Sequence, residues 1–206
     1  GLHHINMKLG LGLGINKGGY VETAPPYFAM TIDTTKSGVS NNNQFQFTGA
    51  VGEYNVDAVQ NGAVFQSYTG LVDQQTITLP SAGVFQVRVY PTGTNPFNQI
   101  KFNSGGDRLK VLSIDSFGTD VIWADFDKAF YNCLNLSEVK GIIYNGQNVS
   151  NFYRCFYNTK IDNLEKGIFD SCINVFYFRA IFHNTLLTNL PEGLFNNSPN
   201  VNNFFR

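Results

Sequence analysis

The sequence predicts a mainly β protein with short helices, arranged as an extended N-terminal arm, a β-sandwich and a short repeat solenoid. Three observations lead to this prediction. Leucine alternates with glycine near the N-terminus, short alternating apolar runs separated by turn-forming residues fill the middle, and a 26-residue repeat fills the C-terminal half. The expected boundaries are residues 1–26 for the arm, 27–104 for the β-sandwich domain and 105–206 for the repeat domain.

The composition favours a folded chain whose partners are not selected by bulk charge. Hydrophobic residues make up 43% of the 206 residues, which is enough for a substantial core, and only 14% are charged, against about 25% in typical soluble domains. The net charge of −1 provides no general attraction to nucleic acid or to anionic lipid. No apolar stretch approaches the roughly 18 residues of a membrane-spanning helix. We therefore expect no nucleic-acid partner and no membrane insertion.

The N-terminal arm has the pattern of a strand that pairs with another chain. In a β-strand this alternation places the aliphatic side chains on one face and the glycines on the other, where a second backbone can come close. Because one short strand is not stable alone, we predict that the arm docks the protein on another chain. The alternatives are an edge strand of the following domain or a disordered leader. The predicted docking residues are Leu9, Leu11, Leu13 and Ile15.

The middle segment alternates apolar and polar residues over several short stretches. Between these stretches lie segments rich in glycine, proline, serine and asparagine, which favour turns. Short strands at this spacing are typical of a β-sandwich with about six or seven strands. The segment contains no cysteine, so its core must come from aromatic and β-branched side chains. The clearest alternations are Phe28, Met30 and Ile32; Phe45 and Phe47; and Phe85, Val87 and Val89.

The C-terminal half repeats with a period of 26 residues. A fixed period indicates stacked units, each too small to bury its own apolar face. Each unit is expected to contain one short strand and a turn or short helix, with its phenylalanines in the solenoid core. Since Arg206 occupies the same repeat position as Arg154, we expect the domain to be incomplete at its C-terminal end. The core phenylalanines are Phe126, Phe152, Phe178 and Phe204 in one column, and Phe130, Phe156 and Phe182 in another.

Polar and tyrosine residues also recur in the repeat. Asn132, Asn158 and Asn184 share a column, and stacked asparagine side chains can hydrogen-bond along the axis of such a stack. Tyrosines flank the core phenylalanines, and exposed rows of tyrosine suit the binding of protein or glycan. Packing into the core is the alternative for these rings. The candidate binding surface consists of Tyr131, Tyr153, Tyr157 and Tyr177.

No sequence motif indicates catalysis, a cofactor or a metal site. The chain has no GxSxG, HExxH or Walker motif, and the glycines of residues 10–14 lack the βαβ context of a dinucleotide site. Asp125 and Asp127 would share a strand face, either as solvated surface or as Ca²⁺ ligands, and a glycosidase pair distant in sequence is a further hypothesis. We expect a non-enzymatic protein without a cofactor. The cysteines, expected as small buried filler rather than zinc ligands or disulfides, are Cys133, Cys155 and Cys172.

Three near-full repeats carry a resemblance to a known family. The stretches AFYNCLNLSEVKG, CFYNTKIDNLEKGIF and IFHNTLLTNLPEGLF resemble BspA-like leucine-rich repeats of the 26-residue surface-protein type. The stretch LPSAGVFQVRVYPTG resembles the end of a PKD-like or immunoglobulin-like sandwich. The resemblance implies a secreted or surface-exposed adhesion module. Two-part chains with a Gly-Leu arm in front also resemble structural proteins of phages that infect Bacteroidetes.

These features lead to two functional hypotheses. In the first, the chain is a phage fibre or surface component of the virion, with other virion proteins or copies of itself as partners and a repeat surface that contacts host protein or glycan. In the second, it is a bacterial adhesin, located extracellularly or on the cell surface, that binds host protein or glycan through the repeat. The arm favours the first hypothesis, because a virion component must dock on its neighbours.

Overall fold

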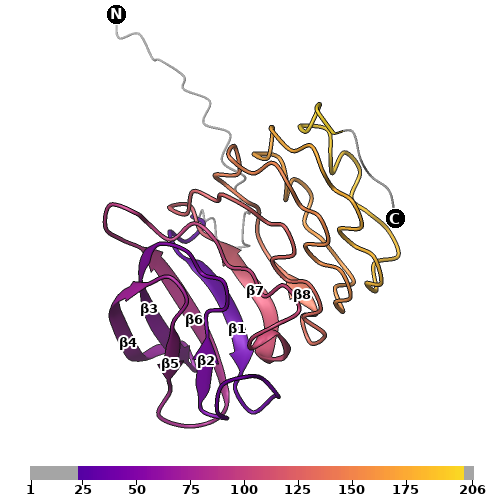
Figure 1. Cartoon of the computed structure of the whole chain (residues 1–206). Helices are drawn as coiled ribbons and strands as arrows, with labels where there is room; N and C mark the ends of the chain where they lie inside the picture. The colour runs from indigo at the N-terminus through magenta and orange to yellow at the C-terminus, as the bar shows by residue number, and fades with distance from the viewer. Residues whose placement is uncertain (1–22, 202–206) are drawn as a thin grey trace, which may run out of the picture.

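The computed structural model describes residues 23–201, which form a mainly β structure, as predicted. Within this range, six strands make one sheet in the order β4-β3-β6-β1-β7-β8, and β2 pairs with β5 in a second sheet (Figure 1). The strands are β1 (Phe28–Asp33), β2 (Gln44–Gln46), β3 (Glu53–Gln60), β4 (Ala63–Val72), β5 (Thr76–Thr78), β6 (Val84–Pro91), β7 (Val111–Phe117) and β8 (Glu138–Val139). The predicted residues that lie outside the described range are Leu9, Leu11, Leu13, Ile15 and Phe204.

β1 lies between β6 and β7 in the larger sheet and pairs antiparallel with both. Met30 of β1 is paired with Val87 of β6, and both side chains are fully buried. Phe28 and Ile32 are buried with Met30, as their period of two requires. β8 joins the far edge in parallel with β7, which makes the sheet mixed.

The two-stranded sheet packs on the larger sheet through aromatic side chains. Phe45 of β2 is fully buried. Phe47, directly after β2, contacts Tyr54 of β3 with ring centroids 5.6 Å apart. The Tyr68 hydroxyl of β4 donates a hydrogen bond of 2.7 Å to the carbonyl oxygen of Thr78 in β5. The aromatic core of this part of the chain is therefore enclosed between the two sheets.

The larger sheet and the repeat segment share one hydrophobic core. β7 lies in the range predicted for the repeat domain, yet it pairs with β1 on one side and β8 on the other. Trp123 contacts Phe126 with ring centroids 4.8 Å apart, and Phe102 contacts Phe130 at 6.1 Å. The buried residues on both sides of these contacts belong to one cluster. The coils of the repeat consequently continue from the β7–β8 side of the sheet, from orange to yellow in Figure 1.

Successive 26-residue segments lie against one another in this coiled region. The Phe130 amide donates to the Cys155 carbonyl at 2.9 Å, and the Phe156 amide donates to the Ile181 carbonyl at 3.0 Å, so neighbouring segments are joined as in a parallel ladder. The Phe156 ring stacks between Phe130 and Phe182, with centroid distances of 5.7 and 5.9 Å. Of the described core phenylalanines, Phe182 is partly buried and the others are buried: Phe126, Phe130, Phe152, Phe156 and Phe178.

The short helices expected in the repeat are almost absent. Within residues 23–201 the one helical element is η1 (Arg108–Lys110), a single 3₁₀ turn. In the first unit φ is 52° at Lys128 and 61° at Asn132, and these values recur in the next unit, with 53° at Arg154 and 61° at Asn158. A residue in the left-handed region interrupts a right-handed helix. Two such residues in each unit turn the chain before a helix can form.

Candidate binding surface on the repeat

Three of the four predicted tyrosines are half-buried, and the fourth is exposed. Tyr131 and Tyr157 occupy the same position in successive units, with ring centroids 5.2 Å apart, and Tyr157 stacks on His183 at 4.7 Å. Tyr153 is half-buried, and Tyr177 exposes 47% of its surface. The structure therefore brings the tyrosines together on neighbouring coils, partly packed and partly open to a ligand.

Cations from three neighbouring coils converge on the ring of Tyr153. Arg154 places its guanidinium carbon 4.9 Å from the ring centroid. The Lys128 ammonium lies 5.6 Å away from the preceding coil, and the Arg179 guanidinium carbon lies 5.8 Å away from the following coil. The stacking produces this convergence, because the amide of Lys128 donates to the carbonyl of Tyr153 at 2.8 Å and places the two coils side by side. All three distances fall within the range of cation–π attraction.

Among the described residues, Arg154 lies over more tyrosine rings than the other two cations. Its guanidinium also lies over Tyr131 and Tyr157, at 5.8 and 5.4 Å from their centroids. Its Nε is shielded from solvent and has no hydrogen-bond partner among the described residues. Within residues 23–201, no carboxylate oxygen lies within 4.0 Å of the charged nitrogens of Lys128, Arg154 or Arg179. The cluster thus holds positive charge that no acidic side chain of residues 23–201 neutralises.

These cations were not among the residues predicted from the sequence. The period of 26 already places Arg154 in the column of Lys128, and Arg179 in the column of Tyr153. This signal could have found them. Their convergence on one ring, however, depends on side-chain direction, which the period does not give.

A hollow of about 260 Å³ opens beside Tyr153. Asn151, Tyr153, Tyr177 and Arg179 line it. The Oδ1 of Asn151 accepts a hydrogen bond of 2.8 Å from the Tyr153 amide, and its Nδ2 has no hydrogen-bond partner among residues 23–201. The hollow therefore combines two aromatic rings, an amide donor and a guanidinium, a set suited to a ligand with an apolar face and anionic or hydroxyl groups.

Asp125 and Asp127, considered above as Ca²⁺ ligands or solvated surface, both bind Lys101. The Lys101 ammonium donates to Asp127 at 2.7 Å and to Asp125 at 3.3 Å. Desolvation lowers the pKa of Lys101, but the hydrogen bonds and charges of Asp127 and Asp125 outweigh it and hold the pKa above its usual value. Within residues 23–201, His, Cys, Asp and Glu side chains form no group of three that could hold a metal ion. These carboxylates are accordingly engaged with an ammonium group.

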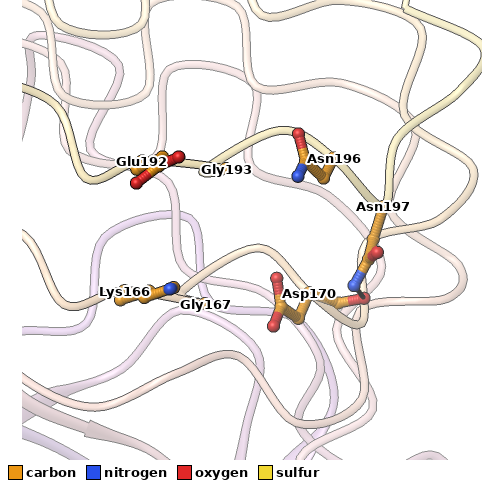
Figure 2. A pocket seen from close by; sticks show the side chains of 7 residues that line it. All are labelled: Lys166, Gly167, Asp170, Glu192, Gly193, Asn196 and Asn197. Carbon is orange, nitrogen blue, oxygen red and sulfur yellow. Dashed lines mark hydrogen bonds between the residues drawn. The ribbon is translucent and has the colours of Figure 1, made fainter.

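A second hollow, of about 320 Å³, lies between two coils nearer the C-terminus (Figure 2). Gly167 and Gly193 form equivalent turns there, with φ of 83° and 77°. Asp170 and Asn197 link the coils, because the Asn197 Nδ2 donates to the Asp170 carbonyl at 3.3 Å. Its other lining residues are Lys166, Glu192 and Asn196. The hollow is explained by the spacing of repeated turns and brings no cation cluster or aromatic surface together.

All three cysteines are buried and free, as the sequence predicted for filler residues. Burial raises the pKa of each thiol above its usual value, and for Cys172 it raises the pKa to about 12. A buried thiol that keeps its proton is a poor nucleophile and a poor metal ligand. None of the three reaches the candidate binding surface.

Comparison with protein-family models, with curated proteins and with solved structures finds no match to this chain. Among the described residues, no helix is long and apolar enough to cross a membrane.

Proposed function

We propose that this chain is a non-enzymatic structural protein of a phage virion, a fibre or surface component that displays the repeat surface for contact with host protein or glycan. Its fold is read as a PKD-like or immunoglobulin-like β-sandwich followed by a BspA-like leucine-rich-repeat solenoid. The observation that carries the proposal is the convergence of Lys128, Arg154 and Arg179 on Tyr153. Partly exposed aromatic and arginine side chains on a packed scaffold are typical of recognition surfaces.

The shared core supports the display role. A surface held by isolated loops would have to become ordered each time it bound a ligand, whereas this surface is already held by backbone ladders and stacked rings. The Phe152 amide donates to the Tyr177 carbonyl at 2.8 Å, and the Arg154 amide donates to the Arg179 carbonyl at 3.0 Å. These bonds order the tyrosines and arginines before a ligand arrives, which reduces the entropy lost on binding.

An uncharged sheet edge supports docking between copies of the chain. β4 is at the edge of the larger sheet, and its ten residues include no charge and no proline. Val64 and Phe65 expose 52% and 55% of their surfaces there. Native proteins usually protect such an edge with charge, proline or a covering segment. We propose that residues 9–15 of another copy, which are also uncharged, add to this edge as a strand.

The test compares the size of the full chain in solution with that of a chain lacking residues 1–22. The proposal expects a defined oligomer, or co-purification with capsid or tail proteins, that is lost without the arm. Phe65→Lys on β4 should weaken the assembly, while Val39→Lys, at a loop residue with 66% exposure, should not. Circular dichroism confirms that each variant is folded. Assembly that survives removal of the arm would overturn the docking proposal.

The second candidate is a secreted BspA-like adhesin, and the same tyrosine and arginine surface favours it. An adhesin needs no assembly through its own arm. A monomer that binds host matrix proteins or glycans, and that never co-purifies with virion proteins, would establish the adhesin in place of the virion component.

A further inference from the structure

We infer that the hollow beside Tyr153 and the cations around it bind an anionic glycan, a sugar chain carrying carboxylate or sulfate groups. This inference rests on the proposed display function, because it names the ligand class of the same surface. We call Lys128, Asn151, Tyr153, Arg154, Tyr177 and Arg179 the tyrosine–cation cluster.

Charge complementarity selects an anionic ligand. The cluster gathers three cations around one ring, and no carboxylate among the described residues pairs with them. The nearby acidic residues Asp125 and Asp127 are already bound to Lys101. Arginine binds carboxylate and sulfate groups through its planar fork of N–H donors, and charge-assisted bonds of this kind are about twice as strong as neutral ones. A neutral ligand would leave this positive charge uncompensated.

The rings select a sugar over a bare anion. Tyr177 exposes 47% of its surface at the rim of the hollow, and Tyr153 lies half-buried beside it. The apolar C–H face of a pyranose ring can cover such a tyrosine ring. Its hydroxyl groups can then accept from the Nδ2 of Asn151, which has no partner in the part of the chain that the structure describes. A small inorganic anion would use the arginines and leave both rings exposed.

The stacked coils favour a chain of sugars over a single one. Equivalent residues recur on successive coils, as the centroid spacings of 5.2 Å for Tyr131–Tyr157 and 4.7 Å for Tyr157–His183 show. The hollow has a volume of about 260 Å³, which is smaller than the usual volume of a site for a drug-sized ligand. An extended ligand running along the coils can reach the hollow, Arg154 and the Tyr157–His183 stack together.

Nucleic acid fits the cluster less well. Its affinity comes mainly from many phosphate contacts along a basic surface. Here the three cations lie in one cluster, and the acidic residues Asp125 and Asp127 come just before Lys128 in the chain. The whole chain has a net charge of −1. Three cations can make only a few phosphate contacts. An acidic sugar chain has its charges spaced along the chain and does not need more than three cations at one site.

The experiment measures binding of the purified full chain to three polysaccharides by isothermal titration calorimetry. Heparin carries sulfate, polysialic acid carries carboxylate, and dextran is neutral. We expect heparin, polysialic acid or both to bind, with affinity falling as salt rises, and dextran not to bind. The two acidic polymers distinguish sulfate from carboxylate as the recognised group. Binding of dextran as tightly as the acidic polymers, or binding of none of the three, would overturn the inference.

Variants assign the binding to the cluster. Arg179→Gln should weaken it about tenfold, and Tyr177→Ala should weaken it by a similar factor, because both residues are exposed and line the hollow. The matched control is Arg88→Gln, since Arg88 also lies over a tyrosine ring, Tyr27 at 5.1 Å, but on the sheet. An equal loss of glycan affinity in the Arg88→Gln variant would show that the glycan does not bind at the tyrosine–cation cluster.

Polyglutamate tests an acidic protein as the ligand. If it binds as tightly as the acidic glycans, and Tyr177→Ala leaves its affinity unchanged, the sugar assignment is wrong. The binding measurement does not depend on assembly, because it can be made on the monomeric or the oligomeric chain. A chain that binds acidic glycan without assembling would therefore overturn the docking proposal alone, and a chain that assembles without binding glycan would overturn this inference alone.

Discussion

The side-chain amide of Asn158 donates a hydrogen bond of 2.8 Å to the Oδ1 of Asn132, which lies 26 residues earlier. Asn184 donates in turn to the Oδ1 of Asn158, and Asn132 donates to the Ser104 hydroxyl at 2.8 Å. All three asparagines have positive φ, between 55° and 61°. Asparagine tolerates this left-handed geometry better than most residues. The column thus allows the turn of each coil and also ties each coil to its neighbour.

Replacing Asn158 by alanine removes both functions. The variant loses two hydrogen bonds, worth about 1 kcal/mol each. It also places alanine in the left-handed region, where alanine is less stable than asparagine by about 1 kcal/mol because it has no polar side chain to bond to the nearby backbone. We expect a loss of about 2–3 kcal/mol in the free energy of unfolding, measured by urea denaturation. Asn158→Gly keeps the turn and loses only the hydrogen bonds, so it should be less destabilised. Equal losses in the two variants would show that the φ requirement is unimportant.

Lys110 is predicted to be essential for stability. It is fully buried, and its ammonium lies 3.5 Å from the equally buried Asp107 and donates to the carbonyls of Ser40, Asn41 and Gln44. Lys110→Met leaves the Asp107 carboxylate buried without its cation. We expect a loss of about 3–5 kcal/mol in the free energy of unfolding.

The matched control for this variant is Lys36→Met. Lys36 pairs with Asp33 at 3.6 Å, but 48% of its side chain is exposed, and exposed pairs contribute about 0–1 kcal/mol. Calorimetric melting temperatures of both variants compare the two pairs directly. Equal melting temperatures would contradict a structural role for the buried pair.

The buried thiols predict a loss of stability at high pH. Folding raises the pKa of Cys172 from about 9 to about 12, so the folded state holds a proton that the unfolded chain releases. This contribution is fully present below pH 9 and is lost as the pH rises through the folded value. The free energy of unfolding should therefore fall between pH 9 and about 12, and the fall should be smaller in Cys172→Ala. A thiol reagent at pH 8 should label the chain only after unfolding; rapid labelling of the native chain would contradict the burial.

The phenylalanine stack predicts a strong dependence on ring volume. Phe156 is fully buried between two rings of neighbouring coils, so Phe156→Ala should cost about 3–5 kcal/mol, as large core truncations do. The control is Leu186→Ala in the same repeat, where 60% of the residue is exposed, and it should change stability by less than about 0.5 kcal/mol. Urea denaturation measures both changes. A similar small effect at both positions would show that the coils do not depend on the stack.

The repeat residues were predictable because the period states which of them share a column. In stacked units, residue i lies beside residue i+26, so the pairing of Phe130 with Phe156 follows from spacing alone. Phe28, Met30 and Ile32 of β1 are buried, as their alternation predicted, but Ala29 and Asp33 on the other face are buried too, which the alternation did not predict. Of the expected turn or short helix in each unit, the structure has the turn, because φ is positive at Lys128 and Asn132. The asparagine was a signal for this geometry, whereas the lysine gave none.

The mainly β class, the stacked phenylalanines and the asparagine column were predictable from the amino-acid order alone, because a repeated local pattern places equivalent residues side by side. The folded structure was needed to show that β7 joins the sheet through β1, and that Lys128, Arg154 and Arg179 meet at Tyr153. Strand pairing between distant segments and the direction of side chains across coils depend on packing, and packing is a property of the whole folded chain.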